Sequence, residues 1–205
     1  MDQFSFIFTI FFMLLGPVKL IPTFVGLTRG TDGQFKRDVA IRGIVIASVL
    51  CAFVALAGGT LLGRYRISLD AVRISGGLVL LLAALQVIFQ RAKLPSPGSG
   101  KPTATQLAAS PVAVPMIVPH AGVAAILICM GLRSQYPGIV LSVAVCLGIM
   151  MVLDFLVMYF IDWVVRTPGL MIVLAVFGSV LVFVQATLAI NLMLVALKSL
   201  GAFKV

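Results

Sequence analysis

Charged side chains are scarce in this sequence. Asp, Glu, Lys and Arg make up only 10% of its 205 residues, whereas hydrophobic residues make up 61%. Soluble domains carry about 25% charged residues, so this chain has too little charge to cover a water-facing surface. The composition therefore excludes a soluble globular protein and predicts a chain that is surrounded by lipid.

Acidic residues are the scarcer of the two charged classes. There are 6 Asp or Glu and 15 Lys or Arg, which gives a net charge of +9. In a soluble protein this excess would suggest a nucleic-acid partner. Here the basic residues lie at the ends of apolar segments and in loops, without interleaved aromatic residues, which favours contact with anionic lipid head groups. We expect the lipid bilayer, and not nucleic acid, as the partner.

Histidine and cysteine are too few for a His-rich metal centre or a disulfide framework. The only histidine is His120, and the three cysteines, Cys51, Cys129 and Cys146, all lie inside apolar segments. An odd number of widely spaced cysteines is typical of packing residues. A P-loop motif is also missing, so this chain is not expected to hydrolyse ATP. We expect no metal, no cofactor and no catalytic residue.

Long apolar segments, in contrast, are abundant. Crossing a bilayer takes about 20 residues in a helix. The segments are continuously apolar and do not alternate, which excludes a transmembrane barrel. The prediction is an all-α, polytopic membrane protein with six transmembrane helices, the first of which is retained as a span and not cleaved as a signal peptide. The six segments are Phe4–Leu27, Val39–Gly63, Ser68–Phe89, Gln106–Leu132, Gly138–Ile161 and Gly169–Leu197.

A stretch rich in Pro, Gly and Ser divides these segments into two groups of three. Residues 91–105 have the composition of a flexible linker between a first three-helix repeat, residues 1–90, and a second, residues 106–205. The apolar pattern is interrupted at matching positions of the first and fourth segments. Because each half has an odd number of spans, the second half enters the membrane from the opposite side. This predicts a 3+3 inverted repeat with broken helices 1 and 4.

The first interruption contains Gly16 and Pro17, followed by Lys19 and Pro22. Proline is favourable as the first residue of a helix, because its missing N–H would be unpaired there in any case. We therefore expect a new helical piece to begin at Pro17. Its free amides and positive dipole end would form a mid-membrane site for a carboxylate or another anion. The alternative is a simple proline kink that neighbouring side chains repair.

The second interruption follows Pro111 and Pro115 and contains Pro119, His120 and Gly122. We expect Pro119, His120 and Gly122 to line the same site as the first interruption. Histidine titrates near neutral pH, so His120 is the candidate relay for any proton-coupled process. Alternatively, its ring nitrogens pair with free backbone groups at the break.

Two charged residues lie deep inside apolar segments, away from the segment ends. Asp154 is in the fifth segment, and intramembrane carboxylates usually face the bundle interior and mark ion or substrate paths. Lys19 either pairs with a substrate carboxylate or with Asp154, or it extends to the membrane surface on its long stem. Gln185, in the sixth segment, either lines a cavity or hydrogen-bonds a neighbouring helix.

Three stretches carry a resemblance to a known family: residues 15–24 (LGPVKLIPTF), 69–77 (LDAVRISGG) and 111–115 (PVAVP). They resemble the MarC family of bacterial inner-membrane proteins, and the resemblance covers essentially the whole chain. It implies a six-helix inner-membrane protein, similar to small exporters and associated with neutral amino-acid transport. Family members usually have Asn-Pro at Gly16-Pro17 and Gly-Pro-Gly at Pro119-His120-Ala121. The family's substrate preference therefore does not carry over automatically.

The expected function is a secondary transporter that exports small amino-acid-like solutes by alternating access at the two broken helices. A proton gradient, a sodium gradient or downhill flux would drive it. Two alternatives are a membrane-embedded enzyme built on His120 and Asp154, and a structural subunit without a solute site. A single histidine and the absence of Glu argue against the enzyme.

Lys and Arg are slightly more numerous in the first, third and fifth loops than at the termini and in the even loops. In addition, no basic residue precedes the first segment and several follow it. Because cytoplasmic loops carry the excess of Lys and Arg, this distribution predicts periplasmic termini and a cytoplasmic linker. The sequence leaves the substrate, the coupling ion and any homo-oligomer open.

Overall fold

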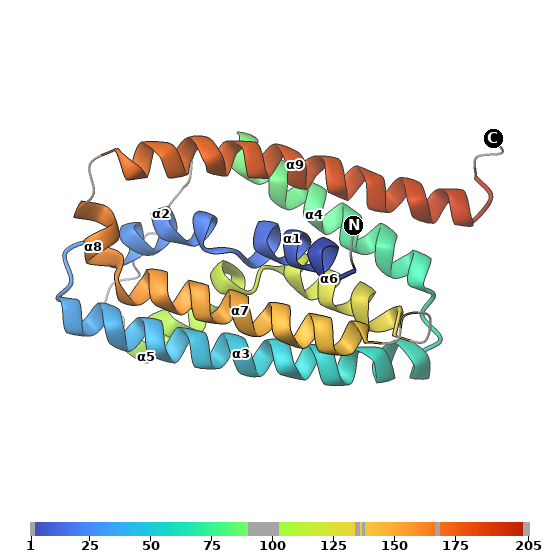
Figure 1. The fold of residues 1–205 in the computed structure, drawn as a ribbon, viewed down its shortest axis with the longest axis horizontal. Helices are drawn as coiled ribbons and strands as arrows, with labels where there is room; N and C mark the ends of the chain where they lie inside the picture. The colour runs from blue at the N-terminus through green and yellow to red at the C-terminus, as the bar shows by residue number, and fades with distance from the viewer. Residues whose placement is uncertain (1–2, 90–102, 134–135, 137, 167–168, 203–205) are drawn as a thin grey trace.

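The computed structural model describes residues 3–89, 103–133, 136, 138–166 and 169–202. Within these ranges all regular structure is helical, as predicted, and the long helices form an elongated bundle (Figure 1). The elements are α1 (Gln3–Leu15), α2 (Pro17–Leu27), α3 (Gly33–Arg64), α4 (Leu69–Phe89), α5 (Ala104–Leu107), η1 (Ala108–Ile117), α6 (His120–Gly131), α7 (Ile139–Tyr159), α8 (Ile161–Arg166) and α9 (Leu170–Ser199).

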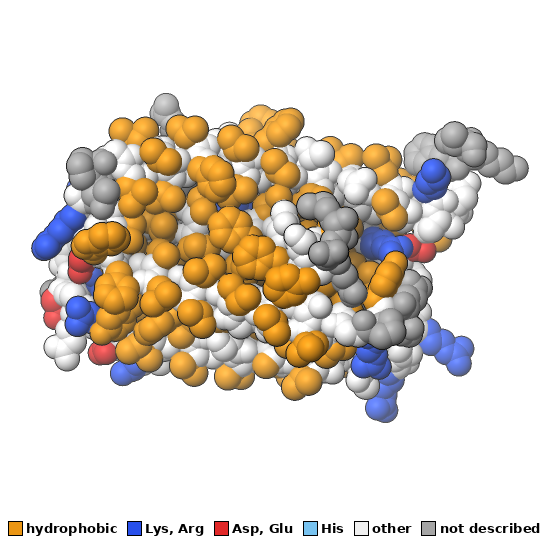
Figure 2. Space-filling view, in the orientation of Figure 1, with side chains coloured by type: hydrophobic (Ala, Val, Ile, Leu, Met, Phe, Trp, Pro, Cys, Tyr) orange, Lys and Arg blue, Asp and Glu red, His pale blue; other side chains and the backbone are white. Residues whose placement is uncertain are grey.

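The surface of the bundle is that of a membrane protein. Among the described residues, five helical stretches are long and apolar enough to cross a membrane, and the bent unit of α5, η1 and α6 gives a sixth when it counts as one span. Hydrophobic side chains cover the sides, and charged side chains gather at the two tips (Figure 2). Leu56, for example, is 78% exposed on α3. An apolar surface of this extent requires lipid around it.

Two helix boundaries differ from the prediction. α3 begins at Gly33 and not at Val39, because Phe35 packs against the core although its neighbours are polar. The sequence also predicts no helix between the fifth and sixth segments, whereas Ile161 to Arg166 form the separate helix α8. Ile161 is only 2% exposed and holds α8 against the end of the bundle.

Most of the linker predicted at residues 91–105 lies outside the described residues. Its last part is ordered as the beginning of α5. The hydroxyl of Thr103 accepts a hydrogen bond from the Gln106 amide, and the Gln106 side chain accepts one from the Thr103 amide. This capping box starts the second half of the bundle. Arg42 of α3 donates a hydrogen bond to the Thr105 hydroxyl and so ties the two halves together here.

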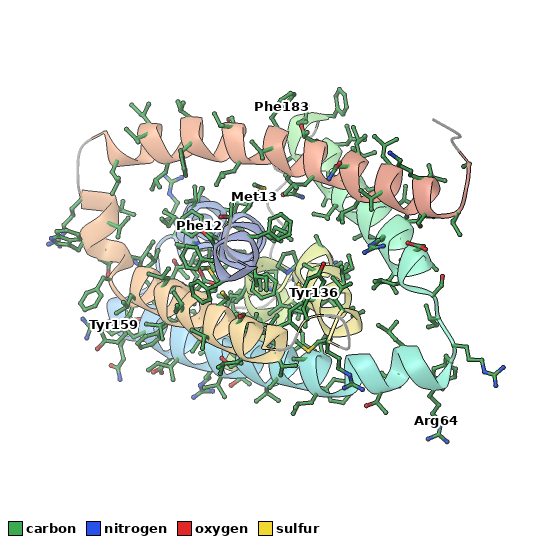
Figure 3. The ribbon with its side chains drawn as sticks, turned by 45° about the vertical axis from the view of Figure 1, so that its right-hand side comes forward. Phe12, Met13, Arg64, Tyr136, Tyr159 and Phe183 are labelled. Carbon is green, nitrogen blue, oxygen red and sulfur yellow. The ribbon has the colours of Figure 1, made fainter. Side chains whose placement is uncertain are left out.

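The first span is more enclosed than the spans formed by α3, α4, α7 and α9. Half of the residues in its apolar window are buried in the protein, against 39% or fewer in those four. Phe11 and Phe24, on either side of the first break, are both 0% exposed. α1 packs against α7 and α6, and α2 packs against α7 and α9. Seen from a second direction, α1 with Phe12 and Met13 lies between α9 and α7 (Figure 3).

The remaining long helices pair across the two halves of the chain. α4 packs along α9, while α3 packs along α7, η1 and α6. The contact between α4 and α9 is close because Gly77 has no side chain: a Cβ there would lie 2.8 Å from the Ala189 carbonyl oxygen. The helices of the first half therefore find most of their long-range partners in the second half.

Candidate functional site

The first break is a single residue long. α1 ends at Leu15, Gly16 is extended (φ −71°, ψ 160°), and α2 begins at Pro17, as predicted. A Cβ at Gly16 would lie only 2.0 Å from the Phe12 carbonyl oxygen, so only glycine fits this backbone. No side chain caps the start of α2. The amides of its first turn and its positive dipole end therefore remain available to an anion.

The second break is longer and less regular. The backbone of η1 departs from helical geometry at Ser110 (φ −147°, ψ 126°) and Val114 (φ −133°, ψ 124°). Pro119 is extended, and α6 begins at His120 without a side-chain cap. The helical pieces on the two sides of the break, Ala104–Ile117 and His120–Gly131, are bent by 58° relative to each other. The fourth span is thus broken at the position that the sequence predicted.

The two breaks lie next to each other inside the bundle. Leu15, the residue before the first break, packs on Gly122 in the first turn of α6. A Cβ at Gly122 would lie 3.2 Å from Leu15 Cγ. Both residues are buried, at the contact between α1 and α6. Gly16, Pro17, Pro119 and Gly122 therefore belong to one region of the interior, as the matching positions of the breaks had suggested.

Lys19 points into the bundle and not toward the membrane surface. Its Nζ donates a hydrogen bond to Gln185 Oε1 on α9, and Gln185 Nε2 donates one to the Leu80 carbonyl oxygen of α4 at 3.2 Å. Gln185 is only 5% exposed. An ammonium has three donors, and the amide oxygen takes one of them. Lys19 therefore keeps donors for a ligand, and the suggested pair between Lys19 and Asp154 is not formed.

Asp154 is the most deeply buried charged residue among those described. It is 0% exposed on α7, and within the described residues neither of its carboxylate oxygens has a hydrogen-bond partner. Burial of a carboxylate without a partner is costly, so this position calls for a proton or for a cationic group of a ligand.

His120 and Pro22 lie in different surroundings from the other predicted site residues. His120 is the first residue of α6, and its side chain is exposed. Pro22 lies inside α2, on the stretch that leads away from the break, and its side chain lines a pocket at the tip of the bundle beside α8. The structure thus brings Pro22 to a second location, separate from the two breaks.

Gln185 was not among the predicted site residues. The sequence marked it only as a polar residue in an apolar segment, with two open uses. Its partner Lys19 is 166 positions away along the chain. The available signal was that Lys19 and Gln185 are each a polar residue in an apolar segment. Their separation along the chain does not show that they are in contact.

Comparison with known sequences identifies the family of this chain. A sequence model of the family described as MarC family integral membrane protein matches residues 1–200. The chain belongs to the MarC family. This confirms the family resemblance that the three sequence stretches indicated.

Individual MarC relatives are distant in sequence. The UPF0056 inner membrane protein YhgN of Escherichia coli (strain K12) is 29% identical over 125 residues, which are 61% of this chain and 61% of YhgN, so the match spans about three fifths of that relative. A UPF0056 membrane protein of Methanocaldococcus jannaschii is 27% identical over 155 residues, 73% of this chain and 76% of the relative. No solved structure matches the chain.

The MarC family and the apolar helices together establish the protein as an integral, multi-pass protein of the inner membrane. The printed names of these relatives state a membrane location and no solute. Any activity must therefore be argued from the two breaks and from the charged residues Lys19 and Asp154.

Proposed function

We propose that this MarC protein is a secondary transporter that binds a small solute at its two helix breaks. The observation that carries the proposal is the packing of Leu15 on Gly122, which brings both breaks together in the interior. Two helices, α2 and α6, begin there without side-chain caps. Broken helices that meet near the midplane are the recurring binding site of secondary transporters, because helix starts and free amides replace water around a polar solute.

The solute class follows from the charges near the breaks. The start of α2 and the Lys19 ammonium favour a carboxylate. Asp154 has no partner among the described residues and favours a cationic group or a proton. A small amino-acid-like solute carries both charges, and we propose export of such solutes. The coupling ion is a proton or sodium, and Asp154 and His120 are the two residues that we propose for carrying a proton.

The proposed mechanism is alternating access by an inverted repeat. The pairing of α4 with α9 and of α3 with α7 supports it, because such pairs are expected when corresponding helices of two opposed halves meet. The two halves would rock about the breaks. We also propose periplasmic termini and a cytoplasmic linker, on the basis of the distribution of Lys and Arg.

Counterflow in proteoliposomes tests this function. The purified full chain is reconstituted, the vesicles are loaded with one unlabelled neutral amino acid, and uptake of the same labelled amino acid is followed. Protein-free vesicles and vesicles with Asp154→Asn serve as controls. We expect counterflow that depends on the internal solute and is lost in Asp154→Asn. A folded protein without counterflow over a broad panel of small amino acids would falsify the proposal.

A further inference from the structure

A pocket of about 510 Å³ opens at the tip of the bundle that carries α8. Its walls come from the second half of α2, the loop after it, the start of α3 and α8 itself. In Figure 1, α8 lies at one tip of the bundle beside the end of α2, away from the end of α1 that carries the N-terminus. The pocket is therefore separate from the two breaks, and we refer to it as the basic pocket.

Basic side chains dominate its rim. Arg29, Lys36 and Arg166 all line the basic pocket, and Asp162 is the only acid among its lining residues. Lys36 Nζ forms an ion pair with Asp162 Oδ1 at 2.6 Å, and this pair connects the start of α3 to α8. Within the described part of the chain, neither arginine forms an ion pair, and both are exposed. Two guanidinium groups thus remain to bind an anion.

Part of the wall of the basic pocket is apolar. Val25 of α2 and Val165 of α8 both line it. Its lining combines apolar residues with the charged residues of the tip, and at this end of the bundle charged side chains adjoin the hydrophobic surface (Figure 2). In a membrane this level is occupied by phospholipid head groups, with the first carbons of the acyl chains just below them. A basic rim over apolar walls matches that distribution of charge.

We propose that the basic pocket binds the phosphate group of an anionic membrane phospholipid. Arg29 and Arg166 contact the phosphate oxygens, since guanidinium groups bind phosphate through paired, charge-assisted hydrogen bonds. Lys36 adds charge while it holds Asp162 in place. Val25 and Val165 pack against the upper part of the acyl chains. Free inorganic phosphate has the same binding chemistry, and the experiment below separates the two sources.

The test uses the only tryptophan, Trp163, which lies on α8 and is 72% exposed. The purified full chain is held in mixed micelles, and its fluorescence is quenched with phospholipids that carry brominated acyl chains. Brominated phosphatidylglycerol is compared with brominated phosphatidylcholine at equal mole fractions. We expect phosphatidylglycerol to quench at lower mole fraction, because only this lipid is anionic.

Paired variants locate the preference. Arg29→Gln with Arg166→Gln removes two charges from the basic pocket, and Arg64→Gln with Arg66→Gln removes two charges from the other tip, where Arg64 lies far from Tyr159 and α8 (Figure 3). Each charge removed from the pocket should weaken the preference about fivefold. Arg29→Lys with Arg166→Lys keeps both charges but loses the paired guanidinium contacts, so it should retain more of the preference than the glutamine pair and less than the parent, and a retained part controls for misfolding.

The outcomes decide between specific binding and simple attraction of charges. A preference that is lost in the pocket pair and kept in the control pair supports the proposal. Displacement by inorganic phosphate, but not by chloride at equal ionic strength, supports a phosphate site that also takes the free ion. No preference in the parent protein, equal loss in both pairs, or equal displacement by chloride overturns it.

Discussion

The two helix breaks differ in length and in enclosure. The first depends on one glycine, Gly16, and is flanked by Phe11 and Phe24, which are both 0% exposed. The second extends over the irregular η1, bends the span by 58°, and ends at an exposed His120. The first break is also tied to α9 through Lys19 and Gln185. We refer to the first break, at Gly16, as the tight break and to the second, from η1 to His120, as the loose break. The two interruptions look alike in the sequence but differ in the structure.

This difference suggests different tasks within one site. The tight break leaves no room for a side chain at Gly16, and Phe11 and Phe24 on either side of it are buried, so it is suited to hold the charged end of a solute. The loose break has extended residues inside a helical segment, and such positions absorb changes of direction when domains move. We therefore expect the first break to determine the affinity for the solute. The second break should change its conformation when the protein switches between inward and outward access.

The largest effect should come from an added methyl group at the tight break. Gly16→Ala places a Cβ against the Phe12 carbonyl oxygen, and we expect a loss of about 3 kcal/mol or more in the free energy of unfolding in mixed micelles. At the loose break, Gly122→Ala meets only the Leu15 side chain, which can move, so a loss of about 1 kcal/mol is expected. Gly178→Ala, where a Cβ has open space, is the control. Equal stability of the Gly16 and Gly178 variants would show that the first break is not tight.

The hydrogen bond between Lys19 and Gln185, which joins α2 to α9, should have the next largest effect on the free energy of unfolding. A double-mutant cycle with Lys19→Met and Gln185→Leu measures it, and we expect a coupling of about 2 kcal/mol, the usual value for a hydrogen bond to a charged group. Both single variants should also lower the affinity for the solute. Additive effects on unfolding would mean that the Lys19–Gln185 bond contributes nothing to the rigidity of the first break.

Removal of the buried carboxylate should affect function and stability in opposite directions. Asp154→Leu deletes two oxygens that have no partner in the described structure, so we expect the protein to become about 1 kcal/mol more stable. Counterflow should be lost in the same variant. A strongly destabilised Asp154→Leu protein would reveal partners that the unliganded site does not show.

The smallest effect on stability should occur at the loose break. His120→Gln changes an exposed residue at the start of α6, and we expect less than about 0.5 kcal/mol in unfolding. If His120 relays protons, the variant still transports, but its rate depends less on pH than the rate of the parent does. A pH profile identical to that of the parent would exclude His120 as the relay and leave Asp154.

Much of this comparison could be predicted from the sequence. Continuous apolar runs define spans because only helices satisfy their own backbone in lipid, and a proline after glycine marks a helix start. The spans and the start of α2 at Pro17 were predicted for these reasons. The first helical turns of α3 and the whole of α8 were not predicted, because polar residues at the end of a span have the composition of a loop. In each of these helices one apolar residue, Phe35 in α3 and Ile161 in α8, packs against the core.

The contacts within the site could not be predicted. Hydrophobic patterns fix which segments cross the membrane, but they do not state how the helices are rotated against each other. The bond between Lys19 and Gln185 joins residues of opposite halves, and the isolation of Asp154 depends on the neighbours of α7.

Solute binding to the purified protein tests the central claim most directly. Small amino acids are screened for a rise in the thermal unfolding midpoint of four proteins: the parent, Lys19→Met, Asp154→Asn, and the Arg29→Gln/Arg166→Gln pair. We predict that at least one amino acid stabilises the parent and the arginine pair, and that it fails to stabilise the Lys19 and Asp154 variants. If the solute stabilises those two variants as much as it stabilises the parent, the binding site is not at the helix breaks.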